Sequence, residues 1–135
     1  MGIQVSLPNG GDPTFGFTYF LAENMAIRAD LGLNISSLSG QTQLFQIDGG
    51  LRYYFMRFEH FMPFVEPGLY IANNAEANMD LALNAGLGGE YFVTDHFSFG
   101  AKTGVALNIA FPPKGGSTDV SFTTGTSAIF GQFLW

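Results

Sequence analysis

Charged residues are scarce in this sequence: they make up 12% of its 135 residues, and only five are basic. A soluble domain averages about 25% charged residues, so the low fraction indicates that much of the surface does not face water. Nucleic-acid binding requires basic clusters. Five bases against eleven acids, a net charge of −6, therefore predict no nucleic-acid partner.

Cysteine is absent, which excludes a disulfide framework and a cysteine-based zinc site. The longest apolar run is shorter than 18 residues, which excludes a transmembrane helix. The sequence also lacks a phosphate-binding loop, zinc-ligand spacing and a nucleophile elbow. We therefore expect no metal, no cofactor and no enzymatic activity.

What the sequence does contain is alternation of apolar and polar residues. Between residues 25 and 35 every odd-numbered residue is apolar, whereas Arg28 and Asp30 stand at even positions. A period of two is the period of a strand. The predicted strands span residues 2–7, 14–22, 25–35, 44–56, 62–72, 79–93, 97–111 and 119–135.

The connections between these strands alternate in length. Short turns at 23–24, 57–60 and 94–96 alternate with longer polar segments at 8–13, 36–43, 73–78 and 112–118. The alternation predicts one all-β domain over residues 1–135: an eight-stranded antiparallel up-and-down transmembrane β-barrel with short periplasmic turns. Both termini then lie on the periplasmic side.

Two strands contain an irregularity. Pro67 stands in the middle of a strand and predicts a local bulge or a lost hydrogen bond, because proline has no N–H. In the last strand Val120 and Phe122 have the opposite parity to Ile129 and Phe133. A bulge near residues 124–125, or a strand end above the membrane, would reconcile them.

All charged residues well inside strands stand on the face opposite the apolar one. An eight-stranded barrel has an interior just wide enough for side chains, and buried charges need partners. We therefore predict an ion-pair network in the lumen. The alternative is a soluble barrel with an apolar core and its charges in water. The residues concerned are Arg28, Asp30, Asp48, Arg52, Glu66, Glu90 and Lys102.

Small residues and aromatic rings favour the membrane alternative. Glycines 32, 50, 68, 86, 88, 100 and 104 share the charged face, where they leave room for long side chains in a narrow lumen. Aromatic residues gather near strand ends, as in the girdles of membrane barrels. One predicted level holds Tyr19, Tyr53, Phe55, Tyr91, Phe97, Phe133 and Trp135, and the other holds Phe15, Phe45 and Phe111.

Residues 19–32 align without a gap on residues 91–104, either as a repeated hairpin or by convergence. With RYYF (52–55), PFVEPGL (63–69) and the terminal strand, these segments resemble the small outer-membrane β-barrel family, which includes the OmpA-like and OmpX-like barrels. The resemblance implies a Gram-negative outer-membrane location, contact with membrane lipids and recognition of the last strand by the barrel assembly machinery. The residues that match this C-terminal assembly signal are Ile129, Phe133 and Trp135.

Strand-like sequence begins directly after Met1, with no secretory signal before it. We therefore expect a mature form from which a signal peptide has been removed. The expected role is structural or interaction-based, as a monomer. The alternatives are a narrow pore for ions or very small solutes, a soluble ligand-binding β-barrel, and a lipid hydrolase that uses the His96-x-Ser98 pair.

Overall fold

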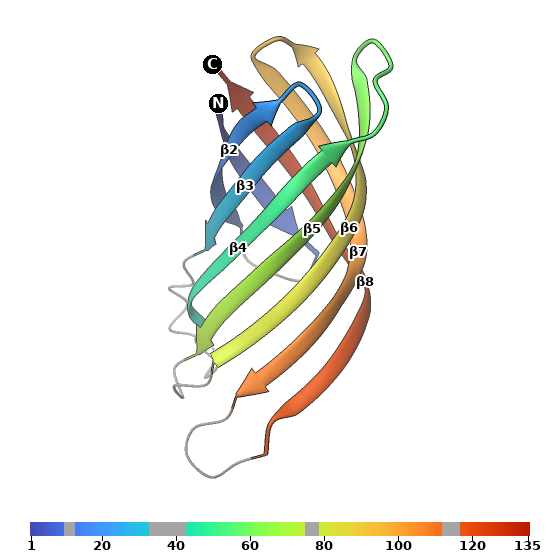
Figure 1. The fold of residues 1–135 in the computed structure, drawn as a ribbon. Coiled ribbons are helices and arrows are strands. Elements are labelled where there is room, and N and C mark those ends of the chain that lie inside the picture. Colours follow the sequence, from blue (N-terminus) through green and yellow to red (C-terminus); the bar gives the residue numbers. More distant parts are fainter. Residues whose placement is uncertain (10–12, 33–42, 75–78, 112–116) are drawn as a thin grey trace.

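The computed structural model describes residues 1–9, 13–32, 43–74, 79–111 and 117–135. Eight strands pair in chain order and close into an antiparallel up-and-down barrel, which confirms the predicted architecture (Figure 1). Within the described ranges no helix has the length and apolar character needed to cross a membrane. The strands are β1 Gly2–Pro8, β2 Thr14–Ala22, β3 Met25–Gly32, β4 Gln43–Tyr54, β5 Phe61–Asn74, β6 Met79–Thr94, β7 Phe97–Phe111 and β8 Asp119–Leu134.

Several strand boundaries differ from the predicted ones. β4 ends at Tyr54 instead of residue 56. An isolated bridge between Phe58 and Phe61 closes the β4–β5 connection. β5 continues to Asn74, so the predicted loop over 73–78 begins too early. Residues 33–35 of the predicted third strand, and the centres of the four predicted longer loops, lie outside the described residues.

The two ends of the barrel differ. The β2–β3, β4–β5 and β6–β7 turns lie at the same end as both chain termini (Figure 1). We call this the turn end, and the opposite end the loop end. The amino group of Met1 donates a hydrogen bond to the carbonyl oxygen of Trp135 at 3.1 Å, so the termini meet where β1 and β8 close the barrel.

Pro67 interrupts the ladder without shifting it. Pairing between β4 and β5 stops at Gly50↔Gly68 and resumes at Tyr53↔Val65 in the same register. The predicted bulge is therefore absent, and the predicted loss of pairing is found on the β4 side. On the β6 side Pro67 keeps its register partner, Ala85.

The predicted bulge in the last strand is present at Gly125. Gly104 pairs with Thr126 and Val105 with Thr124, so Gly125 is the extra residue, and its φ is 76°. The bulge reverses the parity of β8 on its loop-end side. Phe122 then pairs with Leu107 on the same outward face as Ile129.

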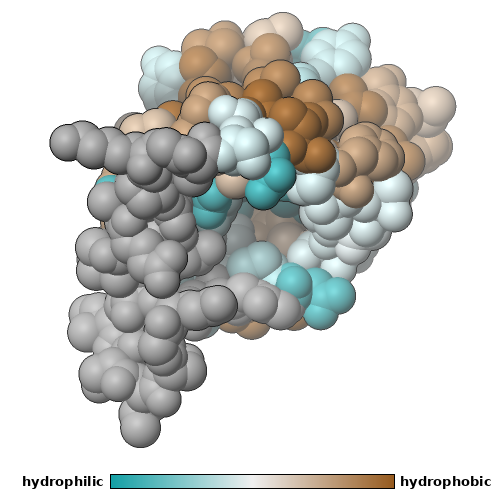
Figure 2. All heavy atoms as spheres, turned by 90° about the horizontal axis from the view of Figure 1, so that it is seen from below, coloured by the Kyte–Doolittle hydropathy of each residue, from teal (hydrophilic) through white to brown (hydrophobic). Residues whose placement is uncertain are grey.

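The apolar faces of the strands point outward and the polar faces point inward. Leu31 and Leu83 are each 52% exposed, whereas Arg28 is 1% exposed. Seen from the loop end, hydrophilic side chains surround a hollow and hydrophobic ones cover the outer surface (Figure 2). The alternative that places the outward apolar residues in the core and the seven charges in water is therefore wrong for this chain.

The bulge generates a prediction for Gly125. A Cβ there would meet nothing within 4 Å, so Gly125→Ala tests only the backbone conformation. Its positive φ should cost about 1 kcal/mol of unfolding free energy, measured by denaturant titration of the refolded barrel. Gly131→Ala is the matched control, because a Cβ there also meets nothing and φ is not positive. Equal stability of the two variants would contradict the bulge geometry.

Candidate functional site

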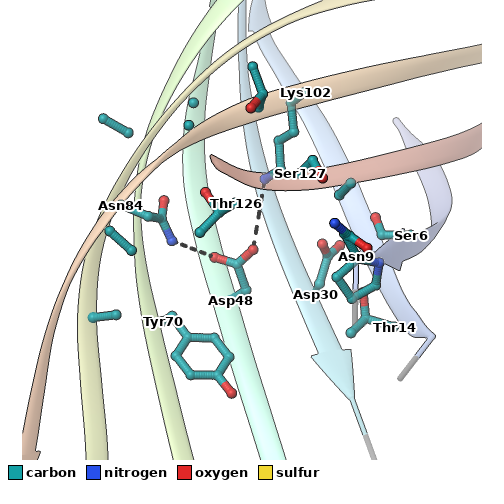
Figure 3. Close-up of a pocket in the computed structure, with 18 of the residues that line it drawn as sticks. Ser6, Asn9, Thr14, Asp30, Asp48, Tyr70, Asn84, Lys102, Thr126 and Ser127 are labelled. Atoms are coloured by element: carbon teal, nitrogen blue, oxygen red, sulfur yellow. Dashed lines mark hydrogen bonds and ion pairs between the residues drawn. The ribbon is translucent and has the colours of Figure 1, made fainter. Parts of the chain in front are cut away.

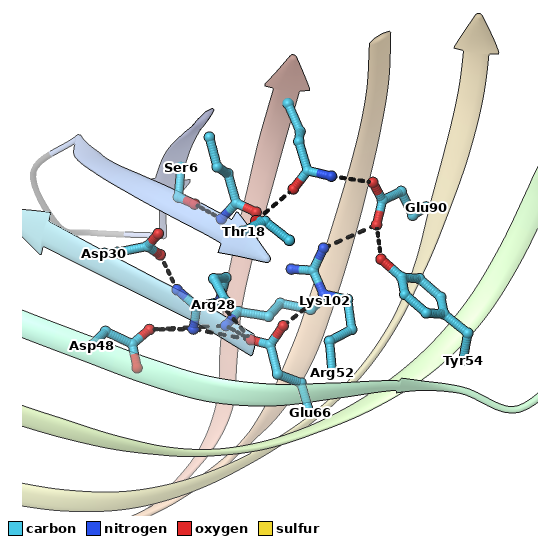
Figure 4. Close-up of polar contacts among 12 residues, drawn as sticks. Ser6, Thr18, Arg28, Asp30, Asp48, Arg52, Tyr54, Glu66, Glu90 and Lys102 are labelled. Carbon is cyan, nitrogen blue, oxygen red and sulfur yellow. Dashed lines mark hydrogen bonds and ion pairs between the residues drawn. The ribbon is translucent and has the colours of Figure 1, made fainter. Parts of the chain in front are cut away.

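The seven charged residues predicted to face the lumen come from five consecutive strands and meet there (Figure 4). Arg28 and Asp30 stand on β3, Asp48 and Arg52 on β4, Glu66 on β5, Glu90 on β6 and Lys102 on β7. Five of them are almost fully buried, while Asp48 and Lys102 are partly exposed.

Glu66 is the centre of the network. Its Oε1 accepts hydrogen bonds from Nε of Arg28 at 3.0 Å and from Nζ of Lys102 at 2.5 Å. Its Oε2 accepts a hydrogen bond from Nε of Arg52 at 2.7 Å. One buried carboxylate therefore joins all three cations of the network, which come from three different strands.

Arg28 neutralises two carboxylates that would otherwise repel each other. Asp30 and Asp48 are direct cross-strand partners, an unfavourable arrangement for like charges. Arg28 forms ion pairs with both, through Nη1 to Asp30 and through Nη2 to Oδ2 of Asp48 at 2.7 Å. The guanidinium group thus occupies the position where repulsion between the two strands would be largest.

Arg52 combines an ion pair with aromatic contacts. Its Nη1 lies 2.9 Å from Oε2 of Glu90, and its guanidinium carbon lies 4.3 Å from the ring centre of Phe64 and 4.4 Å from that of Phe130. A desolvated guanidinium is stabilised by nearby aromatic rings. Arg52 and Glu90 are both fully buried, so the ion pair is shielded from water.

Sequence reasoning did not identify the neutral partners of Glu90. Its oxygens accept hydrogen bonds from the hydroxyls of Tyr54 and Ser98, each at 2.5 Å, and from Nε2 of Gln132 at 3.1 Å. Oε1 of Gln132 in turn accepts a hydrogen bond from Thr18 at 2.7 Å. The alternation of inward and outward residues could have indicated one of these partners, because Tyr54 follows Arg52 by two residues and therefore points inward as well.

Glycines on the inner face provide the space for these side chains. A Cβ on Gly88 would lie 2.5 Å from the ring of Phe64, and one on Gly100 would lie 2.4 Å from the ring of Phe130. A Cβ on Gly50 would lie 3.0 Å from Cγ of Glu66. The predicted role of the glycines thus extends to the aromatic rings.

Apolar side chains fill the lumen at the turn end. A buried cluster contains Ala26, Tyr54, Met62, Phe64 and Phe130, and the rings of Phe20 and Phe92 pack against it. The edge of Phe64 meets the ring of Tyr54 with their centres 5.9 Å apart. The cluster and the Arg52 layer together close the described lumen on this side.

The loop-end half of the lumen is hollow. A cavity of about 380 Å³ lies there, and Asp30, Asp48, Lys102, Tyr70 and Asn84 are among the residues that line it (Figure 3). Lys102 and Asp48 belong to both the network and the cavity wall, and Nζ of Lys102 lies 4.0 Å from Oδ2 of Asp48. Part of the charged network therefore borders the cavity.

The His96-x-Ser98 pair does not form a site. Ser98 is fully buried in the lumen, where its hydroxyl donates to Glu90. His96 lies in the β6–β7 turn, with Nδ1 3.1 Å from the carbonyl oxygen of Leu134. The geometry therefore does not supply the outward-facing pair that the lipid-hydrolase alternative requires.

The three residues of the predicted assembly signal lie on the outer surface near the turn end. Ile129, Phe133 and Trp135 are all exposed, and the rings of Phe133 and Trp135 lie 6.3 Å apart. Their role in assembly stays a prediction.

Comparison of this chain with protein-family models and with curated protein sequences gives no match. The function is therefore inferred from the geometry of the barrel and its lumen.

Neutralising the central carboxylate should destabilise the barrel. Glu66→Gln keeps the side-chain shape but leaves Arg28, Arg52 and Lys102 without their shared anion. Breaking a buried ion pair in this way costs about 3 kcal/mol, which denaturant titration of the refolded protein measures. Glu23→Gln, an exposed carboxylate in the β2–β3 turn, is the control and should have no effect. An equally small effect of both substitutions would show that the network does not stabilise the fold.

Proposed function

We propose that this chain is an integral β-barrel of a Gram-negative outer membrane, a monomer with a structural or interaction role. The observation that carries the proposal is the outward face of the barrel. Most large apolar side chains on it are between 37% and 67% exposed, from Val105 and Leu107 to Phe15. Soluble monomers rarely expose contiguous apolar surface of this extent, whereas lipid tails cover it without cost.

The closed hydrogen-bond ladder supports the same proposal. In a bilayer every backbone N–H and C=O group needs a partner within the protein, and a closed barrel supplies those partners without a free edge. Pairing runs through all eight strands and returns from β8 to β1. The charged side chains, which lipid would exclude, lie inside this wall.

The turn end fits the periplasmic side of the membrane, because outer-membrane barrels have short periplasmic turns. Tyr19, Tyr53, Tyr91 and Trp135 are outward-facing and exposed towards this end. Tyrosine and tryptophan favour the interface between lipid and water, so these rings would anchor the barrel there. In this orientation Ile129, Phe133 and Trp135 would present the proposed assembly signal from the periplasmic side.

A non-conducting lumen is favoured over the narrow-pore alternative. A pore needs a continuous path, but Arg52 is fully buried and contacts the rings of Phe64 and Phe130, and Glu66 is 1% exposed. An ion would have to break several charge-assisted hydrogen bonds to pass this layer. The buried layer across the lumen therefore supports a structural or interaction role without transport.

Refolding followed by conductance measurements tests this proposal. We expect the protein to refold in detergent micelles and to migrate differently on a gel before and after heating, as a compact barrel does. In a planar bilayer the refolded protein should give no steady channels.

Two outcomes would contradict the proposal. A monodisperse protein in buffer without detergent would argue against membrane insertion. Steady channels whose conductance changes in Lys102→Gln would show that the lumen conducts, and would favour the pore.

A further inference from the structure

The first residues of β8 pair with a neighbouring strand on one side only. On that side, residues 119–124 pair with β7 in regular register. On the other side, the pairing of β8 with β1 stops at Pro8↔Ala128, and the amide of Asn9 donates one last hydrogen bond to the carbonyl oxygen of Ser127. Within the described ranges, no strand lies beside residues 119–124 on the β1 side. We call this segment the free edge.

The free edge is held in extended form and is open to solvent. β7 and β8 extend furthest towards the loop end, beyond the part of the barrel that β1 closes (Figure 1). All residues of the free edge are exposed, and the outward-facing Val120 and Phe122 are each 65% exposed. On the inward face, Nδ2 of Asn108 on β7 donates a hydrogen bond to the hydroxyl of Thr123 at 2.9 Å. The strand is thus fixed on its β7 side and accessible on the other.

The backbone of the free edge offers unused hydrogen-bonding groups. Alternate residues of an antiparallel strand direct their N–H and C=O groups to opposite sides, so half of these groups point away from β7. The segment spans about 20 Å. Proteins protect such an edge with lysine, proline, a bulge or a covering segment. The free edge contains neither lysine nor proline, and the bulge at Gly125 lies just outside it.

The connection from β1 to β2 is too short to cover the free edge. Asn9 still bonds to Ser127, and Thr14 already pairs with Ser6, so the chain must return to the barrel after four residues. A residue spans at most about 3.5 Å, so two residues outward and two back reach only about 7 Å. Most of the free edge lies beyond that reach.

A second copy in the same membrane does not fit the free edge either. Two edges face each other only if the copies are related by a half-turn about the membrane normal, and both β8 strands then run from loop end to turn end. Strands of outer-membrane barrels tilt by about 35–45°, so the two edges cross at about 70–90°. Strands that cross so steeply cannot form a hydrogen-bond ladder.

We propose that the free edge binds an extended segment of another polypeptide as an added antiparallel strand, in line with β1. The outward side chains of this segment are apolar, to match Val120 and Phe122. Its inward side chains are polar, and a basic one lies opposite Asp119, the single charged residue of the free edge. The inference rests on the proposed function, because the membrane location is what excludes a second copy.

Fluorescence anisotropy of a labelled peptide tests the inference. The probe is Val-Thr-Val-Thr-Val-Lys with blocked ends, added to the protein refolded in an uncharged detergent, with empty micelles as the blank. In antiparallel register its valines share the outward face of Phe122 and its lysine lies opposite Asp119. We expect saturable binding of one peptide per chain. A peptide with proline at its third and fourth positions should not bind, because one of the two lost N–H groups faces the edge.

A charge exchange tests where the peptide lies. Asp119→Lys should weaken binding of the lysine peptide about fivefold and strengthen binding of a peptide that ends in glutamate, because directly opposed charges interact across a ladder. Asp80→Lys is the matched control, because Asp80 pairs with Ala110 from β6 and Asp119 pairs with it from β8. At about 0.15 M salt, screening should leave both affinities nearly unchanged in the control.

Four results would overturn the inference: no binding above the blank, equal binding of the proline peptide, equal effects of Asp119→Lys and Asp80→Lys, or sedimentation of the refolded protein as a dimer that the peptide dissociates. The last result would identify a second copy as the occupant. Gel migration before and after heating reports on the barrel separately. Normal migration without peptide binding would therefore overturn this inference and leave the proposed function standing.

Discussion

The convergence of three cations on Glu66 is the interaction on which the rest of this barrel depends. The lumen of an eight-stranded barrel is narrow, so a buried inward-facing charge loses its hydration and must find a protein partner. That requirement explains the glycines beneath the long side chains, the aromatic rings against Arg52 and the inward position that all seven charged residues share. With the charges neutralised inside, the outer face is left to apolar residues.

The same network divides the lumen into two unequal halves. Towards the turn end, Glu90 and Arg52 meet an apolar cluster around Phe64 and Phe130, and no charge in that layer lacks a partner of opposite sign. Towards the loop end, Asp30 and Asp48 share one arginine and border a hollow. The proposal for a non-conducting barrel rests on the buried half of the lumen towards the turn end.

Much of this arrangement could be predicted from the sequence, because the alternation of apolar and polar residues indicates which residues share a face. The bounds of β2 and β7 and the inward direction of all seven charged residues were predicted in this way. The bulge was predicted because the parity of Val120 conflicts with that of Ile129. Parity does not state which inward residues meet, since that depends on how the strands tilt and close. The partners Tyr54, Ser98 and Gln132 of Glu90, the stacking of Phe64 on Arg52 and the cavity therefore emerged only in three dimensions.

The central claim, that lipid contacts the apolar face while the charged face is enclosed, can be measured directly because the chain has no cysteine. Single cysteines at residues 105 to 109 of β7 can carry nitroxide labels in the barrel reconstituted into vesicles. Collisions with dissolved oxygen should be frequent at Val105, Leu107 and Ile109 and rare at Ala106 and Asn108. The opposite alternation, or none, would contradict the account.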